Sequence, residues 1–357
     1  MQLPLNQLAA ELDGDLYFDA LWRSLFATDA SVYRTLPTAV AYPKSEKDIK
    51  QLIQFAKKYK TSLIPRTAGT SLAGQVVGEG IVVDVSKYFT KILEVNQKAK
   101  TVTVQPGVIR DDLNRFLEPY GLFFGPNTST SNRCMIGGMV GNNSSGTTSI
   151  KYGLTRDKVL KLKTLLSDGS EVVFSELKKE EFQKKLKLET LEGEIYRSLN
   201  SELASEEVQA RIKSNFPKPE IHRRNTGYAI DALISSEVFT TSEEKLNLCK
   251  LLSGSEGTLA FTTEITLQLD VLPPKKALMI AAHFTSVKKC LQAVVPAMRH
   301  SLYTCEMMDK VILDCTKNSI KYKENRFFIE GDPAAILMLE IRSDNETDLM
   351  NQSAELL

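Results

Sequence analysis

The sequence predicts an α+β protein of about two domains. In residues 45–85 a helix-like stretch stands before two strand-like runs, which is typical of a small α/β unit. Residues 92–107 and 159–174 instead have the pattern of antiparallel hairpins. After Pro273-Pro274, strand and helix patterns alternate again, so a second domain is expected there.

Residues 45–60 have the pattern of a capped amphipathic helix. Ser45 is the expected N-cap, Asp48 stands at the third helical position, and an apolar stripe follows. Residues 62–65 then predict a buried strand that runs into a glycine-rich loop, and residues 81–85 predict another strand. Loops at the carboxyl ends of strands are common ligand sites in open α/β sheets.

Two hairpins and one long strand are expected further along. Strand-like runs flank residues 96–100, and Asp168-Gly169 joins two more, which is a residue pair that tight hairpin turns favour. An alternating pattern predicts a strand over 259–269. At the N-terminus, residues 3–27 predict an amphipathic helix that is interrupted at Asp13-Gly14.

The stretch 175–215 is charged and helix-prone. Both signs of charge are interspersed, which favours a solvated helical insertion over a nucleic-acid-binding arm.

The last part of the chain predicts half of a compact α+β domain. The expected elements are a strand at 278–284, a helix at 286–300, a helix at 304–318 and a strand at 334–343. One such half leaves an unpaired sheet edge. The natural protein is therefore expected to continue beyond Leu357, or a partner to complete the sheet.

Composition excludes several classes of protein. A formal net charge of +1 gives no electrostatic case for nucleic acid or an anionic membrane. No apolar run approaches the roughly 20 residues of a membrane helix, and the N-terminus lacks the pattern of a secretory signal. The 5 cysteines are scattered without a CxxC pair, which disfavours disulfides, zinc and Fe–S clusters within this chain. Free thiols in a reducing cytoplasm are expected.

Two long segments are crowded with small residues, PRTAGTSLAGQ at 65–75 and IGGMVGNNSSGTTSIKYG at 136–153, and a short one, SGSEGT, follows at 253–258. Glycine lets other atoms approach the backbone closely, and small hydroxyl and amide side chains add hydrogen-bonding groups without bulk. Such loops can cradle a pyrophosphate. They end in no Walker A Gly-Lys-Ser/Thr and contain no GxGxxG, so a nucleotide or flavin site of another kind is favoured.

These segments also carry a resemblance to a known family. Together with VVDVSKY, PGV, GPNTSTSNRC, YGLTRDKVL, LLSDG and SGSEGTLAFTTEITL, they resemble the FAD-binding PCMH-type domain of the vanillyl-alcohol-oxidase superfamily. The chain looks most like the group of glycolate oxidase, D-lactate dehydrogenase and D-2-hydroxyglutarate dehydrogenase. The motifs span roughly residues 34–270 and follow the order in that family.

The resemblance implies a domain plan. An FAD-binding domain of two α+β subdomains is expected over residues 1–272, followed by a partial ferredoxin-like cap over 273–357. The first subdomain would span 1–90 and the second 91–272, with a helical insertion at about 175–240.

The resemblance also implies which residues bind FAD. Those that would wrap the pyrophosphate are Arg66, Thr67, Ala68, Gly69, Thr70 and Ser71. Those that would line the flavin are Pro126, Asn127, Thr128 and Ser131. Those that would face the adenosine diphosphate and the ring edge are Gly137, Gly138, Gly141, Asn142 and Ser145, and the last contacting turn would be Glu256, Gly257, Thr258 and Leu259. Thr70 occupies the position of the histidine that links FAD in covalent members, so non-covalent FAD is expected.

The segment HRRNTGYAID offers substrate-binding residues. Arg223, Arg224 and Tyr228 are candidates, because an arginine fork suits a carboxylate. A surface basic patch or a helix cap is the competing interpretation. Arg133 and Arg156 are expected to be structural. No metal site is expected, because the Pro-Gly-His-like motif that holds metal in the hydroxy-acid group is absent.

The implied activity is FAD-dependent oxidation of a 2-hydroxy acid such as D-lactate, glycolate or D-2-hydroxyglutarate, with hydride transfer to flavin N5. The catalytic residues are unknown, and the base is expected beyond Leu357. Long relatives add an Fe–S domain, so a downstream Fe–S domain or subunit is one candidate electron acceptor. The alternatives are an oxidase of another alcohol or sugar-type substrate, and a flavin-binding electron-relay subunit without its own substrate site.

Overall fold

The chain separates into two compact units in the computed structural model, which describes residues 3–225 and 227–357. The first unit consists of residues up to Phe124, Thr128–Ser144 and Leu154–Asp270. The second consists of Gly125–Asn127, Ser145–Gly153 and Val271–Leu357. The domain boundaries expected from the sequence stay a prediction.

A four-stranded mixed sheet opens the first unit. Its elements are α1 (Leu5–Glu11), β1 (Asp15–Tyr17), α2 (Ala20–Leu25), β2 (Ala39–Tyr42), α3 (Glu46–Tyr59), β3 (Leu63–Arg66) and β4 (Ile81–Asp84). The strand order is β1-β2-β4-β3, with β1 antiparallel to β2 and the other pairs parallel. Ser45 caps α3 by accepting from the Asp48 N–H at 3.5 Å, so the predicted helix start is confirmed.

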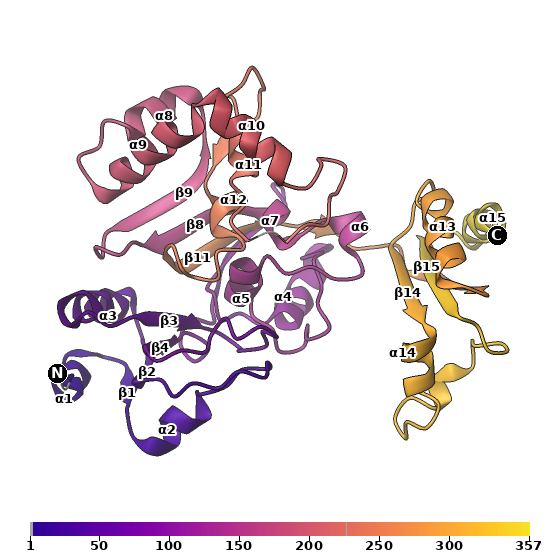
Figure 1. Cartoon of the computed structure of the whole chain (residues 1–357), viewed down its shortest axis with the longest axis horizontal. Helices are drawn as coiled ribbons and strands as arrows, with labels where there is room; N and C mark the ends of the chain where they lie inside the picture. The colour runs from indigo at the N-terminus through magenta and orange to yellow at the C-terminus, as the bar shows by residue number, and fades with distance from the viewer. Residues whose placement is uncertain (1–2, 226) are drawn as a thin grey trace. The chain divides into compact units, whose positions relative to one another are not determined.

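Alternate residues of the central strands face two different cores. Ala39, Ala41, Ile81 and Val83 pack with the apolar stripe of α3, whereas Val40, Tyr42 and Val82 pack with Trp22 and Phe26 of the α2 region. This period of two places α3 and α2 on opposite faces of the sheet (Figure 1).

A six-stranded antiparallel sheet forms the rest of the first unit. Its strands are β5 (Ile92–Asn96), β6 (Thr101–Val104), β8 (Val159–Leu165), β9 (Glu171–Leu177), β10 (Leu246–Asn247) and β11 (Phe261–Gln268). The order is β10-β9-β8-β11-β6-β5. Both predicted hairpins are confirmed, and Gly169 adopts the left-handed φ of +85° that the Asp-Gly turn requires.

Helices and short strands complete this unit. They are α4 (Arg110–Leu117), η1 (Glu118–Tyr120), β7 (Leu122–Phe123), α5 (Ile136–Asn142), α7 (Thr155–Lys158), α8 (Lys179–Lys185), α9 (Leu191–Leu203), α10 (Glu206–Asn215), α11 (Asp231–Ile234) and α12 (Cys249–Leu252). The short strand β12 (Asp270–Val271) includes the last residue of the first unit and the first of Val271–Leu357. The stretch 175–215 is helical beyond β9, as its composition predicts. Phe182 of α8 and Tyr196 of α9 anchor it in the same core as Phe174 of β9.

An ion cluster joins helix α3 to the six-stranded sheet. Lys163 of β8 lies 3.0 Å from Glu46 at the start of α3, 3.3 Å from Glu171 of β9 and 3.5 Å from Glu264 of β11. Although burial opposes it, hydrogen bonding to Glu46 and Glu171 raises the pKa of Lys163. One cation therefore neutralises carboxylates from three elements.

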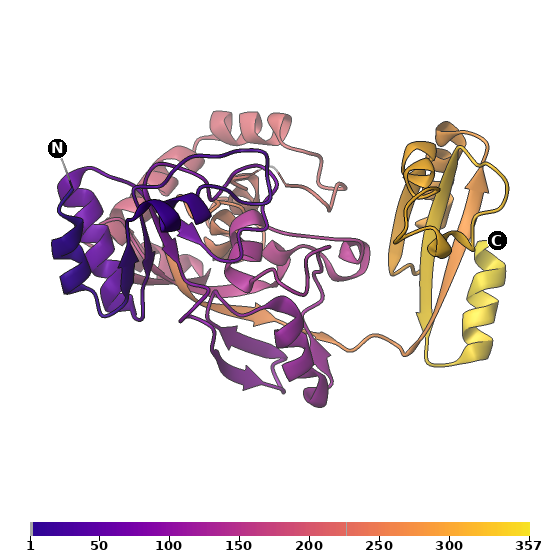
Figure 2. The ribbon, with the colours of Figure 1, turned by 90° about the horizontal axis from the view of Figure 1, so that it is seen from below.

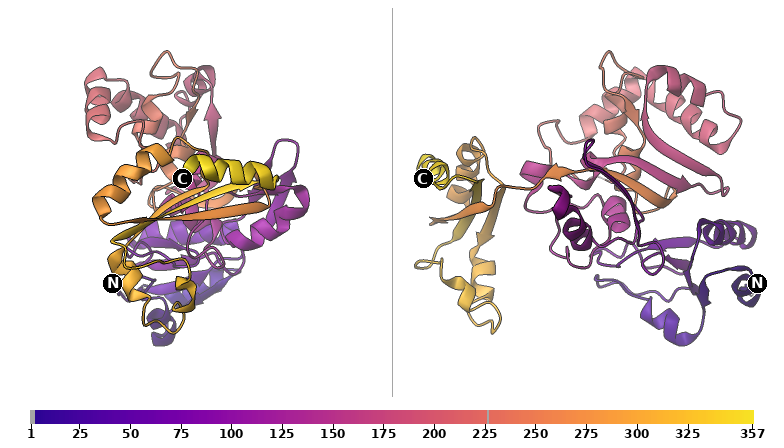
Figure 3. Two further views of the ribbon diagram at one scale, coloured as in Figure 1. Left: turned by 90° about the vertical axis from the view of Figure 1, so that its right-hand side faces the viewer. Right: turned by 180° about the vertical axis from the view of Figure 1, so that it is seen from behind.

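The second unit is a three-stranded antiparallel sheet with helices. Its elements are α6 (Ser149–Tyr152), β13 (Lys276–Phe284), α13 (Val287–Ala297), β14 (Thr304–Asp309), α14 (Lys310–Cys315), η2 (Glu324–Arg326), β15 (Ala335–Ser343) and α15 (Glu346–Leu356). The order β13-β15-β14 corresponds to strands one, three and two of a ferredoxin-like sheet. Helices α13 and α15 share a core with the central strand β15, and both lie on the same face of the sheet (Figures 2 and 3).

Two predicted helices are wrong in part. Residues 304–309 form a strand, because they pair along the edge of β15, and the real helix begins only after Asp309, whose carboxylate accepts from the Ile312 N–H. Residues 15–17 likewise form β1 rather than helix, because they pair with β2. In both cases sheet pairing outweighs a weak local preference.

Candidate functional site

The loop after β3 is built around Arg66. An added Cβ on Gly69, which has a φ of +63°, would lie 2.5 Å from the Arg66 Nη2 atom, so the loop curls closely over the guanidinium. Arg66 also donates to the Thr28 carbonyl at 2.9 Å and lies over the Phe26 ring, 4.9 Å from its centroid. Burial lowers the pKa of Arg66, with Asp84 and Asp29 opposing the shift. A fixed positive charge therefore lies beneath this loop.

Helix α5 approaches this loop through glycines. An added Cβ on Gly138 would lie only 2.6 Å from the Thr67 Oγ1 atom, and one on Gly137 would lie 2.4 Å from the Pro106 Cβ atom. Gly141 has more room, since its added Cβ would lie 3.7 Å from the Glu256 Cα atom, which is ordinary contact. Side chains at the first two positions would push the elements apart.

The 253–258 turn completes the junction. The Gly254 N–H donates to the Val140 carbonyl and the Glu256 N–H to the Gly141 carbonyl, both at 2.9 Å. An added Cβ on Gly257, with a φ of +72°, would lie 3.1 Å from the Pro65 Cγ atom. Three segments far apart in the sequence thus meet closely: α5 and the 253–258 turn through backbone hydrogen bonds, and loop 65–75 through side chains set against glycines.

Arg156 stabilises the 253–258 turn through hydrogen bonds to backbone carbonyls. It is buried and donates to the carbonyl groups of Ser253, Lys250 and Gly227, at 2.6 to 3.0 Å. Burial, reinforced by the charge of Arg224, lowers the pKa of Arg156 to about 10. The Arg156 N–H donates to the Oδ1 atom of Asn143, whose Nδ2 lies 3.0 Å from the Asn225 Oδ1 atom. The expected structural role of Arg156 agrees with these contacts.

Other predicted cofactor residues have protein partners of their own. The Ser131 hydroxyl donates to Asp111 at 2.9 Å, and the Thr128 hydroxyl lies 3.2 Å from the Cys134 sulfur. Pro126, Asn127 and Ser145 fall in the second unit, where the Asn127 Oδ1 atom accepts from the Thr148 hydroxyl at 2.9 Å.

The candidate substrate residues lie around the insertion. The Tyr228 hydroxyl is 2.6 Å from the Thr258 Oγ1 atom, which places Tyr228 against the 253–258 turn. Arg224 forms an ion pair with Asp231. Thr226, within the same motif, lies outside the described residues. The substrate assignment of Arg223, Arg224 and Tyr228 stays a prediction.

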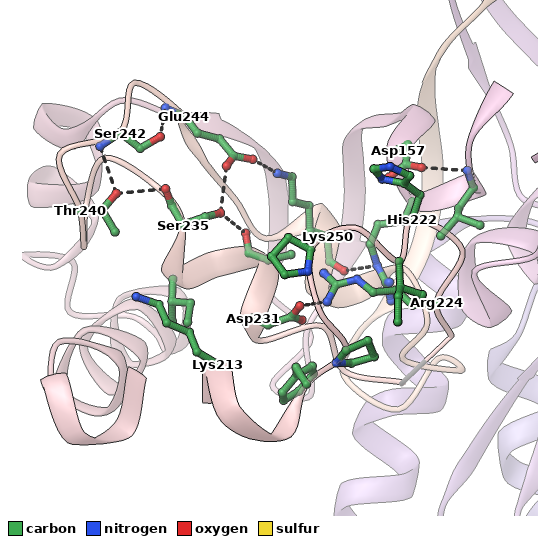
Figure 4. A pocket seen from close by; sticks show the side chains of 18 residues that line it. Asp157, Lys213, His222, Arg224, Asp231, Ser235, Thr240, Ser242, Glu244 and Lys250 are labelled. Carbon is green, nitrogen blue, oxygen red and sulfur yellow. Dashed lines mark hydrogen bonds and ion pairs between the residues drawn. The ribbon is translucent and has the colours of Figure 1, made fainter. Parts of the chain in front are cut away.

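Arg224 lines a pocket of about 850 Å³ between α7, α10 and α11 (Figure 4). Neither residues 65–75 nor α5 contributes to its lining. Three cations of its lining have partners, since Arg224 pairs with Asp231, Lys250 with Glu244, and Arg156 with backbone carbonyls, and Lys213 of α10 lines the pocket as well.

The structure adds residues that sequence patterns missed. Gln75 lies 3.5 Å from a Glu256 carboxylate oxygen, and Tyr33 packs where an added Cβ of Gly74 would lie 2.7 Å from its ring. Gln75 ends the first glycine-rich segment, but no local pattern indicates a partner 181 positions away.

Two models of known protein families match the chain. Residues 37–175 match the FAD binding domain, and residues 273–357 match the C-terminal domain of FAD linked oxidases. The chain therefore carries both an FAD binding domain and the C-terminal domain of FAD linked oxidases, and its expected α+β class, its resemblance to FAD-linked oxidases and its cofactor, FAD, are confirmed.

Individual relatives indicate which FAD-linked enzymes the chain is similar to. The chain is 34% identical over 333 residues to D-2-hydroxyglutarate dehydrogenase of Haemophilus influenzae, covering 92% of this chain and 32% of the relative. It is 34% identical to D-2-hydroxyglutarate dehydrogenase of Escherichia coli (K12), covering 90% of this chain and 31% of the relative. Glycolate oxidase subunit GlcD of Escherichia coli (K12) is 26% identical over 89% of this chain and 51% of its own length. The chain thus spans about a third of the length of the dehydrogenases.

Solved structures support the fold. Alkyldihydroxyacetonephosphate synthase aligns with a TM-score of 0.66 at 16% identity, covering 100% of this chain and 58% of that one. The BBE-like 1 protein of Physcomitrella patens aligns with a TM-score of 0.61 at 14% identity, covering 99% of this chain and 59% of that one.

The junction of the three segments fits FAD. Gly257 has a left-handed φ of +72° and no side chain, so a ligand can approach the backbone of this turn closely. The hydroxyl-bearing residues of 67–71 and the Arg66 charge lie on the neighbouring loop. These features suit the pyrophosphate of FAD. In the described part of the chain, no group of three or more His, Cys, Asp or Glu residues could hold a metal ion.

The two α5 glycines are expected to respond differently to alanine. Gly138→Ala forces a Cβ against Thr67, so it should destabilise the FAD-free protein by about 1–3 kcal/mol. Gly141→Ala has room and should leave stability unchanged or raise it by up to about 1 kcal/mol, yet it should weaken FAD binding at least about tenfold if this face meets the cofactor. Urea unfolding and FAD titration of both variants measure this. Full FAD affinity in Gly141→Ala would contradict the placement of Gly141 against FAD.

Non-covalent FAD is expected because Thr70 has no nucleophilic imidazole. Acid precipitation of the purified protein should release all flavin into the supernatant. Flavin that remains with the denatured protein on a gel would contradict the expectation.

Proposed function

We propose that this chain is the FAD-binding and cap portion of a dehydrogenase that oxidises a 2-hydroxy acid, with D-2-hydroxyglutarate as the first candidate. The observation that carries the proposal is the 34% identity to D-2-hydroxyglutarate dehydrogenases over 92% of this chain. Similarity to a glycolate oxidase subunit supports the wider class of 2-hydroxy acids.

The chain's own residues bind and orient the cofactor. When bound, FAD supplies the acceptor for the hydride that leaves the substrate carbon. The loop after β3, α5 and the 253–258 turn hold the cofactor, and the half-buried Arg66 provides positive charge for its phosphates. The catalytic base stays unassigned.

Arg224 is the favoured group for a substrate carboxylate. A guanidinium has five N–H donors, so one carboxylate does not saturate it, and Asp231 leaves donors for a second partner. Tyr228 contacts Thr258 of the predicted last FAD turn, which supports a place for this segment close to the cofactor. Arg223 belongs to the same motif and the same proposal.

The electron acceptor, compartment and domain limits belong to the proposal as well. We propose transfer to a downstream Fe–S domain or subunit, a cytoplasmic location, and domains over residues 1–272 and 273–357. No helix among the described residues is long and apolar enough to cross a membrane.

An anaerobic titration tests the activity. The FAD-loaded protein should lose its visible flavin absorbance with D-2-hydroxyglutarate, and more slowly with D-lactate or glycolate, because electrons pass from the hydroxyl carbon to the flavin. L-2-hydroxyglutarate serves as the stereochemical control. Flavin that dithionite reduces but none of these acids reduces would contradict the proposed substrate class for this chain.

Removal of the Arg224 charge should weaken substrate binding. Arg224→Met is expected to raise the D-2-hydroxyglutarate concentration for half-maximal flavin reduction about tenfold or more, since a charged hydrogen bond contributes roughly 1.5–3 kcal/mol. Arg224→Lys should recover part of the loss. Arg211→Met, at an exposed position of α10, is the matched control. An unchanged half-maximal concentration in Arg224→Met would remove Arg224 from the substrate site.

A further inference from the structure

Glu256 occupies a backbone conformation that favours glycine. Its φ is +52°, and the flanking Gly254 and Gly257 have φ values of +96° and +72°. A left-handed conformation is costly for a residue with a side chain, and such strain concentrates at functional sites. Something other than local backbone preference must account for a glutamate here.

The Glu256 carboxylate links two other segments. Its Oε1 atom accepts from the Asn142 Nδ2 atom at 3.0 Å and from the Gln75 Nε2 atom at 3.5 Å. Its N–H donates to the Gly141 carbonyl. One residue therefore connects the end of the first glycine-rich loop, the last turn of α5 and the third segment.

The surroundings of this carboxylate are neutral. Burial raises the pKa of Glu256, and the amides of Asn142 and Gln75 oppose that shift. Loop 65–75 presents Gln75 to it and α5 presents Asn142; in the described chain no charged group contributes to the shift. The carboxylate therefore loses hydration without gaining a countercharge, and its ionised form is held by the two amides alone.

We propose that Glu256 is a positioning residue, a carboxylate clasp that closes the FAD site by tying loop 65–75 to α5. Hydrogen bonds to an ionised acceptor are about twice as strong as neutral ones, so the ionised form holds the two segments most firmly. The inference rests on FAD binding and not on the proposed substrate.

The clasp predicts that stability and FAD affinity change in opposite directions. Glu256→Gly relieves the left-handed strain and the burial of charge, so the FAD-free protein should gain stability. The same change removes the link between Gln75 and Asn142, so FAD binding should weaken about tenfold. If Glu256 served only the fold, its substitution would lower both the stability and the FAD affinity, or change neither.

The clasp also predicts a pH dependence. Because the folded pKa is raised, the carboxyl group's contribution to folding is present below the ordinary carboxyl pKa and is lost as pH rises through the raised value. FAD affinity should depend on pH in the opposite direction. It should fall as pH drops through the raised pKa, because a protonated oxygen is a poorer acceptor for two N–H donors. Glu256→Gln keeps the shape but cannot ionise, and should lose this dependence.

The test is FAD titration of the full chain from mildly acidic to mildly alkaline pH. The single tryptophan, Trp22, is a convenient fluorescent reporter, because it stacks near Phe26, over which Arg66 lies. Lys60→Gly is the matched control for strain, since Lys60 has the same φ of +52° at the end of α3. It should raise stability and leave FAD affinity unchanged. Glu118→Gln, at an exposed position, should keep the wild-type pH dependence.

A double-mutant cycle checks that the contacts themselves matter. Gln75→Leu and Glu256→Gln should each weaken FAD binding, and the double variant should lose less than the product of the two effects. Wild-type affinity in Glu256→Gly, a retained pH dependence in Glu256→Gln, or strictly independent effects would each overturn the proposal. Since no hydroxy acid enters these titrations, such results leave the proposed substrate untouched.

Discussion

Close approach of backbone at one junction is the constraint on which the site depends. Loop 65–75, α5 and the 253–258 turn meet where Gly138 faces Thr67 and Gly257 faces Pro65, and an added methyl group at either position would fall within 3.1 Å of the other segment. Side chains there would separate the two sheets of the first unit. The glycines are therefore needed first for close contact between the segments, and the proposed FAD cradle is a consequence of that contact.

A half-buried arginine and a buried one stabilise this junction, and among the described residues their guanidinium groups donate to backbone carbonyls. Arg66 donates to a backbone carbonyl and lies over an aromatic ring, and Arg156 is held by backbone carbonyls on the far side of the 253–258 turn. Carbonyl groups satisfy the N–H donors but carry no full countercharge. Burial therefore lowers both pKa values, although Asp84 and Asp29 oppose the shift at Arg66 and Asp157 opposes it at Arg156. Through Gly227 and Asn225, the same network connects the insertion to the 253–258 turn.

Sequence patterns predicted those elements whose signals are local. Ser45, Asp168-Gly169 and the alternation in 259–269 each specify a cap, a turn or a strand over a few residues, and the structure has all three. Residues 304–309 and 15–17 were assigned wrongly because their conformation is set by a neighbouring strand. Gln75 could not be singled out, because its partner is Glu256, on a separate segment.

The sequence by itself determined the family, the cofactor and the three small-residue segments, because small residues at fixed positions are a requirement of backbone contact that any fold of this kind must meet. Only the tertiary structure decided which of those residues touch. It showed that Gly141 has space where Gly138 has none, that Arg224 already has Asp231 as a partner, and that Glu256 bridges two segments. The glycine contacts and the Glu256 bridge arise from distances between segments that are remote in the chain. Arg224 and Asp231 are only 7 positions apart, but their pairing depends on the path that the folded chain takes between them.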